Sequence, residues 1–210
     1  MKNYISVSLL IIGVVTCLPT QAESLFIPKF GYVDWGTSRA TIEGADMEFE
    51  RSESQWAPIG KYSVGMEYNY RFPTNFAIGA EASYERLEDK NTPLISGERD
   101  GYAHVYRYMA VAKYYIPTYI IFRPYVGFGL GRAEMHIHST RNANLGGSTY
   151  MSKIGFELQA SDRVGIGFEY RNAKLNMDDP SNNEFNSRNR ELFFQITFHS
   201  KSRSQRWQRL

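Results

Sequence analysis

The chain has 210 residues, of which 24 are Lys or Arg and 22 are Asp or Glu, so its formal net charge is +2. This length fits one or two domains, and a hydrophobic content of 42% is enough to form a core. The near-neutral charge argues against a disordered or a nucleic-acid-binding chain. The sequence contains no run of 18 apolar residues and its mean hydropathy is -0.43, which excludes a helical membrane protein but not a membrane β-barrel.

Residues 1–22 have the features of a secretory signal peptide that is cleaved. Lys2 precedes an apolar stretch over residues 5–18, and Ala22 ends a small-residue cleavage motif. A stretch of about fourteen apolar residues is too short to span a bilayer comfortably, which favours cleavage before Glu23. Cys17, the single cysteine, lies in this segment, so the mature chain would have no thiol. A lipoprotein signal is the alternative, although the residues before Cys17 lack the usual small side chain.

Beyond residue 22, apolar and polar residues alternate, and this period of two predicts β-strands. In residues 61–72, for example, Val64 and Met66 share an apolar face, whereas Gly65 and Glu67 lie on the opposite face. Five segments alternate clearly: 61–72, 75–87, 150–160, 163–171 and 191–199. Three alternate less cleanly: 25–35, 102–116 and 122–131. Together they predict eight strands.

The polar face of these strands is predicted to line the inside of a barrel. A water-soluble β-sandwich, the alternative, would bury the apolar face, whereas an outer-membrane barrel exposes it to lipid and encloses a polar lumen. The lumen of an eight-stranded barrel is only wide enough for side chains, so some inward positions must be small. Nine glycines share the polar face: Gly31, Gly65, Gly79, Gly127, Gly129, Gly131, Gly155, Gly165 and Gly167. We therefore predict an all-β fold, an eight-stranded antiparallel up-and-down transmembrane β-barrel over residues 23–200.

Ten charged residues on the polar face are predicted to form a network of ion pairs that fills the lumen. They are Glu67, Arg71, Glu81, Arg107, Lys113, Arg123, Lys153, Glu157, Glu169 and Arg171. A narrow pore lined by the same residues is the alternative, but aqueous channels are typical of barrels with about sixteen strands. The ionic character of this lumen argues against the passage of small apolar molecules.

Short and long connections alternate along the chain, as periplasmic turns and extracellular loops do. The short connections are 72–75, 117–121 and 160–163, and the long ones are 36–60, 88–101, 134–148 and 176–188. With that topology, outward-facing aromatic residues form two bands, which explains a content of 15 Tyr, 13 Phe and 3 Trp as two membrane-interface girdles. The prediction is a bacterial outer-membrane protein with loops at the cell surface and both termini in the periplasm.

The segment 124–131, Pro-Tyr-Val-Gly-Phe-Gly-Leu-Gly, resembles a signature of the outer membrane β-barrel family, which includes opacity-like surface antigens and OmpA/OmpX-type proteins. The resemblance covers roughly residues 25–198. It implies a role in colonisation, host-surface contact or envelope integrity. Phe194, Ile196 and Phe198 also resemble the family's signal for the outer-membrane assembly machinery, although this chain continues past Phe198.

The first long connection is a candidate surface-binding loop. Its acidic residues are Glu43, Asp46, Glu48, Glu50 and Glu53, against the basic Arg39 and Arg51, a local balance of 2 minus 5, or -3. Loops on a rigid scaffold often carry binding function, so this one is a candidate site for a basic host surface or a neighbouring protein. The alternative is that the charge only keeps the loop solvated.

An enzyme is the alternative from another functional class. Glu134, His136 and His138 would share one face of an extended strand, with Ser152 on the next strand, which supplies an acid, a base and a nucleophile for an outer-leaflet lipid-modifying enzyme of the lipid A deacylase or acyltransferase type. The same histidines offer a candidate zinc site, and residues 176–186 are rich in Asp and Asn without matching an EF-hand. We predict no enzymatic activity, no metal and no other cofactor.

Residues 201–210 are predicted to form a basic periplasmic tail. Lys201, Arg203, Arg206 and Arg209 give it a charge of +4, which suits contact with anionic lipid headgroups; a simple solubilising tail is the alternative. The predicted partners are outer-membrane lipid and lipopolysaccharide, the assembly machinery and a host surface ligand, with no nucleic acid. A closed barrel needs no second copy, so a monomer is expected.

Overall fold

The computed structural model describes residues 22–42, 45–49, 62–88, 102–118, 121–138, 143–178 and 184–201. Side chains are described over somewhat shorter stretches, beginning at residue 22 and omitting 34–50. Almost all of the predicted signal peptide and of the basic tail lies outside these residues, so both stay predictions. In the described part of the chain, no helix has the length and apolar character needed to cross a membrane.

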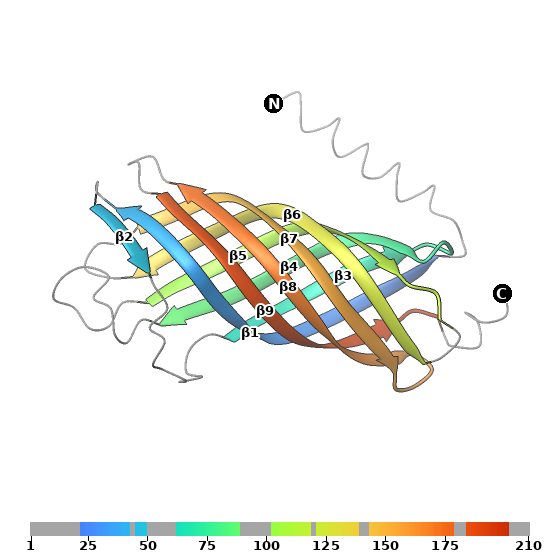
Figure 1. Cartoon of the computed structure of the whole chain (residues 1–210). Coiled ribbons are helices and arrows are strands. Elements are labelled where there is room, and N and C mark those ends of the chain that lie inside the picture. The colour runs from blue at the N-terminus through green and yellow to red at the C-terminus, as the bar shows by residue number, and fades with distance from the viewer. Residues whose placement is uncertain are drawn as a thin grey trace, which may run out of the picture.

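The described residues form one antiparallel sheet that closes on itself (Figure 1). Its strands are β1 (Glu23–Ile42), β2 (Ala45–Phe49), β3 (Tyr62–Arg71), β4 (Phe76–Glu88), β5 (Tyr102–Tyr115), β6 (Phe122–His138), β7 (Ala143–Gln159), β8 (Val164–Asp178) and β9 (Glu184–His199). Each strand from β3 to β9 pairs with the next, β1 pairs with β3, and β9 pairs with β1. The predicted eight-stranded barrel is confirmed, with β2 as a short additional strand that pairs with the far end of β1.

The wall of the barrel alternates as predicted, with apolar side chains outside and mostly polar side chains inside. On β9, for example, Leu192 and Phe194 are exposed, whereas Glu191, Phe193 and Gln195 are buried. The exposed outward set includes Phe30, Val64, Met66, Val126, Phe128, Leu130, Ile154, Ile166 and Phe168. An apolar exterior around a polar interior is the arrangement that a lipid environment stabilises.

The strands are staggered around the barrel. A row of register partners starts at Val164 on β8 and runs through Phe198, Phe26, Tyr68, Ala80, Ala110, Leu130 and Tyr150 back to β8 at Lys174. The row therefore returns ten residues further along the same strand, since 174 minus 164 is 10. Such a stagger requires strands that tilt strongly against the barrel axis, as Figure 1 shows.

One end of the barrel is closed by short turns. In the turn between β3 and β4, the Asn75 amide donates to the Phe72 carbonyl oxygen at 3.1 Å, and Asn75 has a φ of 63°, which asparagine tolerates better than most residues. The first and last strands meet at this same end, where Leu25 pairs with His199 and the Ser200 amide donates to the Ser24 carbonyl oxygen at 3.0 Å.

At the opposite end, three of the four long connections are shorter than predicted. β1 extends to Ile42, β6 and β7 extend to His138 and from Ala143, and β8 and β9 leave only residues 179–183 between them. The predicted boundaries 36–60, 134–148 and 176–188 are wrong. On β6 to β9, outward positions become polar near these ends, so apolar alternation stops while backbone pairing continues. The connection between β4 and β5 agrees with the prediction.

Candidate functional site: the charged lumen

The centre of the lumen holds a compact group of charged side chains. Three glutamates, Glu67 on β3, Glu81 on β4 and Glu169 on β8, have carboxylate oxygens within 4.8 Å of one another. Three carboxylates this close repel one another unless cations lie between them. Four basic side chains do so, and with the glutamates they form what we call the central cluster: Lys29, Glu67, Glu81, Lys113, Lys153, Glu169 and Arg171.

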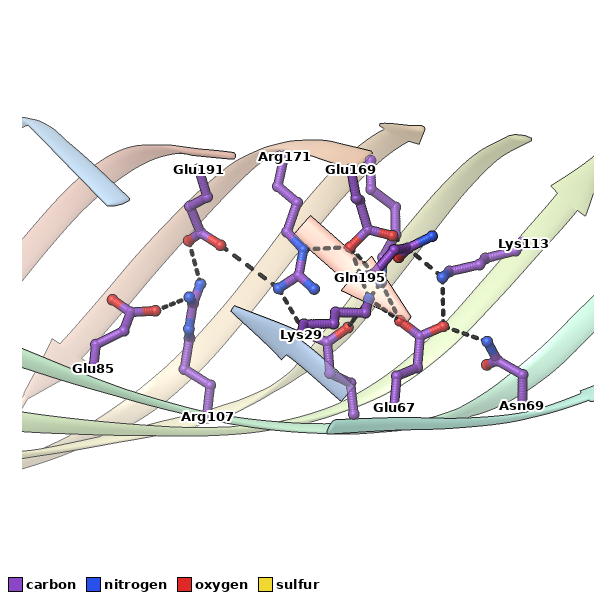
Figure 2. Close-up of polar contacts among 12 residues, drawn as sticks. Lys29, Glu67, Asn69, Glu85, Arg107, Lys113, Glu169, Arg171, Glu191 and Gln195 are labelled. Atoms are coloured by element: carbon purple, nitrogen blue, oxygen red, sulfur yellow. Dashed lines mark hydrogen bonds and ion pairs between the residues drawn. The ribbon is translucent and has the colours of Figure 1, made fainter. Parts of the chain in front are cut away.

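Each lysine of the central cluster binds more than one glutamate (Figure 2). The Lys29 ammonium contacts Glu67 and lies 3.2 Å from Glu81 and 2.8 Å from Glu169. The Lys153 ammonium, from the facing part of the wall, lies 3.1 Å from Glu67 and 3.0 Å from Glu81. The ion pairs therefore cross the lumen and tie β1, β3, β4, β7 and β8 together.

Lys113 and Arg171 complete the central cluster. The Lys113 ammonium lies 2.6 Å from Glu67 and 3.2 Å from Glu169, while the Arg171 guanidinium lies 2.6 Å from both Glu81 and Glu169. All of these side chains are essentially buried. Ionic groups removed from water are stable only when each is paired and hydrogen-bonded, and here every carboxylate has at least three cationic neighbours.

A second group of ion pairs continues from the central cluster toward the long-loop end. The Arg107 guanidinium contacts Glu85 and lies 2.5 Å from Glu191. Glu191 also lies 3.6 Å from Arg171, which connects the two groups. The second group adds Arg107, Glu85 and Glu191 to the four basic and three acidic side chains of the central cluster. The combined network therefore contains five basic and five acidic side chains.

Tyr125 on β6 and Gln195 on β9 border the central cluster on the side that faces the short-turn end. The Tyr125 hydroxyl lies 2.7 Å from the Glu169 carboxylate and 3.1 Å from the Gln195 amide oxygen. The Lys113 ammonium stands 4.6 Å from the centre of the Tyr125 ring, which adds a cation–π contact. The phenol thus adds a neutral hydrogen bond to a carboxylate that the basic side chains also bind.

A separate ionic cluster closes the lumen at the short-turn end. His199 on β9 lies between two carboxylates, with Nδ1 at 3.0 Å from Glu23 and Nε2 at 2.8 Å from Glu157. A carboxylate only accepts hydrogen bonds, so both ring nitrogens donate here only in the imidazolium form. Arg71 contacts Glu23, and the Arg123 guanidinium lies 3.8 Å from Glu157.

Toward the long-loop end the lumen contains many apolar side chains, beside buried polar ones such as Thr149, Ser187 and Asn189. Eleven buried residues form one apolar cluster there: Val105, Met109, Val111, Ala133, Met135, Leu145, Met151, Ala173, Leu175, Met177 and Phe185. The prediction of an ionic lumen throughout was therefore wrong for this half. The ionic argument against apolar small molecules applies only to the central and short-turn parts.

Glycines make room for the larger lumen side chains, as predicted. A Cβ atom at Gly155 would lie 2.6 Å from the Tyr125 ring, and one at Gly165 would lie 2.6 Å from the Glu157 side chain. Both distances are far below a normal carbon contact. The two glycines thus allow Tyr125 and Glu157 to cross the lumen toward their polar partners.

All ten residues predicted for the lumen network point into the barrel, but the structure divides them among three groups. Six belong to the central cluster, Arg107 belongs to the group with Glu85 and Glu191, and Arg71, Arg123 and Glu157 lie at the short-turn end. The prediction omitted five charged or ionisable participants, Glu23, Lys29, Glu85, Glu191 and His199, and three neutral ones, Asn69, Tyr125 and Gln195. The same alternation places all of them on the inward face, so the signal was present in the sequence.

The structure does not bring the candidate catalytic residues together. His136 on β6 lies opposite Asn144, whose side-chain oxygen is 2.7 Å from its Nδ1, whereas Ser152 lies opposite Phe128. Eight residues separate Asn144 from Ser152, which is roughly 26 Å along β7. Glu134 instead lies 3.8 Å from Arg132. The assumed register was wrong, and Ser152 is too distant to be activated by His136.

The remaining candidate residues are only partly described. Glu43, Glu50 and Glu53 lie outside the described residues, while Asp46 and Glu48 lie in β2 rather than in a loop. The His138 side chain and residues 179–183 also lie outside the described part, so the zinc and calcium hypotheses are untested there. Within the described residues, the three-ligand group that could hold a metal is Glu67, Glu81 and Glu169, and lysine ammonium groups already neutralise it.

Comparison with known proteins agrees with this architecture. Neisserial surface protein A is 13% identical to the chain, with a TM-score of 0.57 over 84% of this chain and 97% of that one. OprG of Pseudomonas aeruginosa is also 13% identical, with a TM-score of 0.57 over 86% of this chain and 96% of its own. Among curated protein sequences, none matches significantly. The sequence model described as "Outer membrane protein beta-barrel domain" matches residues 7–188, and the chain therefore belongs to this family of outer-membrane barrels.

Proposed function

We propose that the protein is a non-catalytic outer-membrane barrel that displays its long connections at the cell surface, with a role in adhesion, colonisation or envelope integrity. The observation that carries this proposal is the central cluster. Lys29 and Lys153 bind the same glutamates from different parts of the wall, so charged side chains occupy the middle of the lumen. Such a barrel is a rigid support for loops rather than an aqueous channel.

The proposed orientation has the short turns and both termini in the periplasm and the long connections outside. It is supported by the meeting of β1 and β9 at the short-turn end and by the length of the opposite connections, such as residues 50–61 and 89–101. The acidic residues Asp46, Glu48, Glu50 and Glu53 lie in or beside the first of these. A basic host surface or a neighbouring protein is the partner that their charge would attract.

Further partners follow from the same proposal. The outward apolar residues of β9, including Phe194 and Phe198, would present the assembly signal to the outer-membrane assembly machinery. A closed sheet leaves no long unpaired edge, which favours a monomer. Residues 201–210 would extend into the periplasm as a basic tail.

A lipid-modifying enzyme is the alternative, and the roughly 26 Å between the position opposite His136 and Ser152 weighs against it. Two deletion strains separate the hypotheses. One lacks residues 50–61, the other lacks residues 89–101, and both are compared with the intact strain in host-cell binding and in lipid A mass spectrometry. Reduced binding in one deletion strain with an unchanged lipid A profile is expected. Unchanged binding in both strains, or lipid A that changes when the protein is absent, would overturn the proposal.

The closed lumen has its own test. In planar lipid bilayers, the intact barrel is expected to show no stable channel of constant conductance. A Lys29→Ala/Glu67→Ala variant removes two side chains from the central cluster. Its conductance shows what a barrel with a less tightly filled lumen would give. A stable conductance in the intact protein that matches the variant would mean that the central cluster does not block ion flow.

A further inference from the structure

Four basic side chains on the outer wall lie directly beyond the apolar belt at the long-loop end. We call them the basic patch: Arg132 on β6, Lys174 on β8, and Arg188 and Arg190 on β9. All four occupy outward positions of their strands, and three are exposed, with Lys174 half-buried. The next outward residues toward the short-turn end are Leu130 on β6 and Leu192 on β9, whereas on β8 the polar Asn172 stands between Lys174 and Tyr170.

Strand tilt brings these four residues to one level of the membrane. With strands tilted by about 40°, each residue along a strand climbs about 2.5 Å, and each step along the register row climbs about 3 Å. Lys174 is two strands beyond Leu130 in this row, so it lies about 6 Å closer to the long-loop end than Leu130. Arg132, two residues further along β6, lies about 5 Å above Leu130 in the same direction. Arg188 is the register partner of Lys174 on β9. Arg190 lies two residues nearer the short-turn end of the same strand, which places it about 4 Å above Leu130.

The rest of the wall carries tyrosines at this level. The same row geometry places Tyr32 on β1, Tyr62 on β3, Tyr84 on β4 and Tyr106 on β5 within about 4 Å of the height of Lys174. The described outer interface thus carries tyrosines on β1, β3, β4 and β5, with Arg86 beside them on β4, whereas cations predominate on β6, β8 and β9 around Tyr150 on β7. Tyrosine is the usual residue of a membrane interface, so the cations on β6, β8 and β9 need another explanation.

The basic patch is not neutralised by the protein where its side chains are described. Lys174 and Arg188 are direct register partners, and like charges directly opposite each other in a sheet are destabilising. Among the described side chains, none forms an ion pair with Lys174, Arg188 or Arg190; the Lys174 ammonium lies 5.9 Å from the Tyr150 ring. Arg132 has only the exposed Glu134 at 3.8 Å, and the backbone of Asp34 pairs with that of Arg190.

We propose that the basic patch binds the phosphate groups of the phosphorylated glycolipid, lipid A, in the outer leaflet. Guanidinium and ammonium groups at the edge of an apolar belt suit a ligand with acyl chains below and phosphates at the interface. A phosphate between Lys174 and Arg188 would remove their repulsion. The inference rests on the proposed orientation, because only then does the patch face the outer leaflet.

The test measures binding of defined lipids to the purified full-length barrel in detergent micelles by native mass spectrometry. The probes are bisphosphorylated lipid A, the same lipid without phosphates, and phosphatidylglycerol. The patch variant is Arg188→Gln/Arg190→Gln. The matched control, Arg163→Gln/Lys201→Gln, removes two cations at the short-turn end, and Lys174→Gln is a second, milder patch variant.

Intact protein and control are expected to bind bisphosphorylated lipid A about tenfold more tightly than the double patch variant, with Lys174→Gln in between. Lipid A without phosphates should bind all four proteins equally and weakly. Equal binding of bisphosphorylated lipid A to intact and patch-variant proteins would overturn the proposal. So would phosphatidylglycerol binding with the same dependence on the patch, since that would be general attraction to anionic lipid. Failure of the proposed orientation would be detected separately, by surface labelling of introduced cysteines in cells. Failure of the proposed adhesive role would be detected by the loop deletions.

Discussion

The Lys29 ammonium on β1 and the Glu169 carboxylate on β8 lie 2.8 Å apart, although 140 residues separate them in the sequence. The contact is buried in the lumen and reaches across β9, the strand that lies between β8 and β1. It is part of a cluster in which Lys29 is shared among Glu67, Glu81 and Glu169. Removing one member of such a cluster leaves several charged groups in a dry environment, each with one partner fewer.

Lys29→Met is therefore expected to destabilise the barrel strongly. Breaking a buried ionic cluster by removing one partner typically costs about 3–5 kcal/mol, because the remaining charges stay buried. The measurement is urea-induced unfolding in lipid vesicles, followed by the strand signal in circular dichroism. Arg163→Met, which removes an exposed cation in a turn, should change the unfolding free energy by less than about 0.5 kcal/mol. An unfolding midpoint for Lys29→Met equal to that of the intact protein would show that Lys29 is not needed to neutralise the glutamates.

The group of Arg107, Glu85 and Glu191 allows the opposite comparison. Arg107→Met alone leaves two buried carboxylates and should lower the unfolding free energy by about 3–5 kcal/mol. The triple variant Arg107→Met/Glu85→Leu/Glu191→Leu replaces the whole group with apolar side chains next to the existing apolar cluster, and its stability should return close to that of the intact protein. A triple variant less stable than Arg107→Met would mean that the ion pairs themselves supply net stability.

Two glycines provide a test of how tightly the lumen is packed. A Cβ at Gly155 would meet the Tyr125 ring and the Phe168 carbonyl oxygen, each at 2.6 Å, and neither can move freely. At Gly129, the nearest atoms are the methyl groups of Met151 at 2.8 Å and Met109 at 3.2 Å, which are the flexible ends of side chains. Gly155→Ala should therefore cost about 1–3 kcal/mol and Gly129→Ala clearly less. Equal unfolding midpoints for the two variants would indicate that Tyr125 moves away without loss.

Alternation in the sequence was sufficient to predict the eight strands of the barrel wall and the inward side of each one, but not β2 or the far ends of the strands. Lys29, Glu85 and Glu191 follow the same rule, so their role was accessible from the sequence once all inward charges were counted. The grouping of these charges was not, because it depends on the ten-residue stagger, which no single strand reveals. Arg123 and Glu157 are direct register partners on adjacent strands, but Lys153 of β7 meets Glu67 of β3 only because of how the strands are staggered around the barrel.

Two other features were hidden for physical reasons. The strands continue beyond the membrane level, where Asn172, Lys174 and Asn176 face outward on β8, so hydrogen bonding persists without an apolar pattern. The inward face of the same strand ends beyond that level in Leu175 and Met177, which reverses the usual contrast. An alternation rule that assumes one fixed polarity for each face cannot predict this change.

The predicted absence of cysteine from the mature chain provides a direct test of orientation and of signal cleavage. Cys17 is the single cysteine and lies in the predicted signal peptide, so purified mature protein should not react with a maleimide.

Asn186→Cys introduces a thiol at the long-loop end of β9, and Thr74→Cys introduces one in the turn between β3 and β4, with both positions on the surface. A membrane-impermeant maleimide added to intact cells should label Asn186→Cys, and label Thr74→Cys only after the outer membrane is permeabilised. Labelling of Thr74→Cys in intact cells without labelling of Asn186→Cys would reverse the orientation and move the basic patch to the inner leaflet. Reaction of the protein without introduced cysteines would show instead that residue 17 is retained.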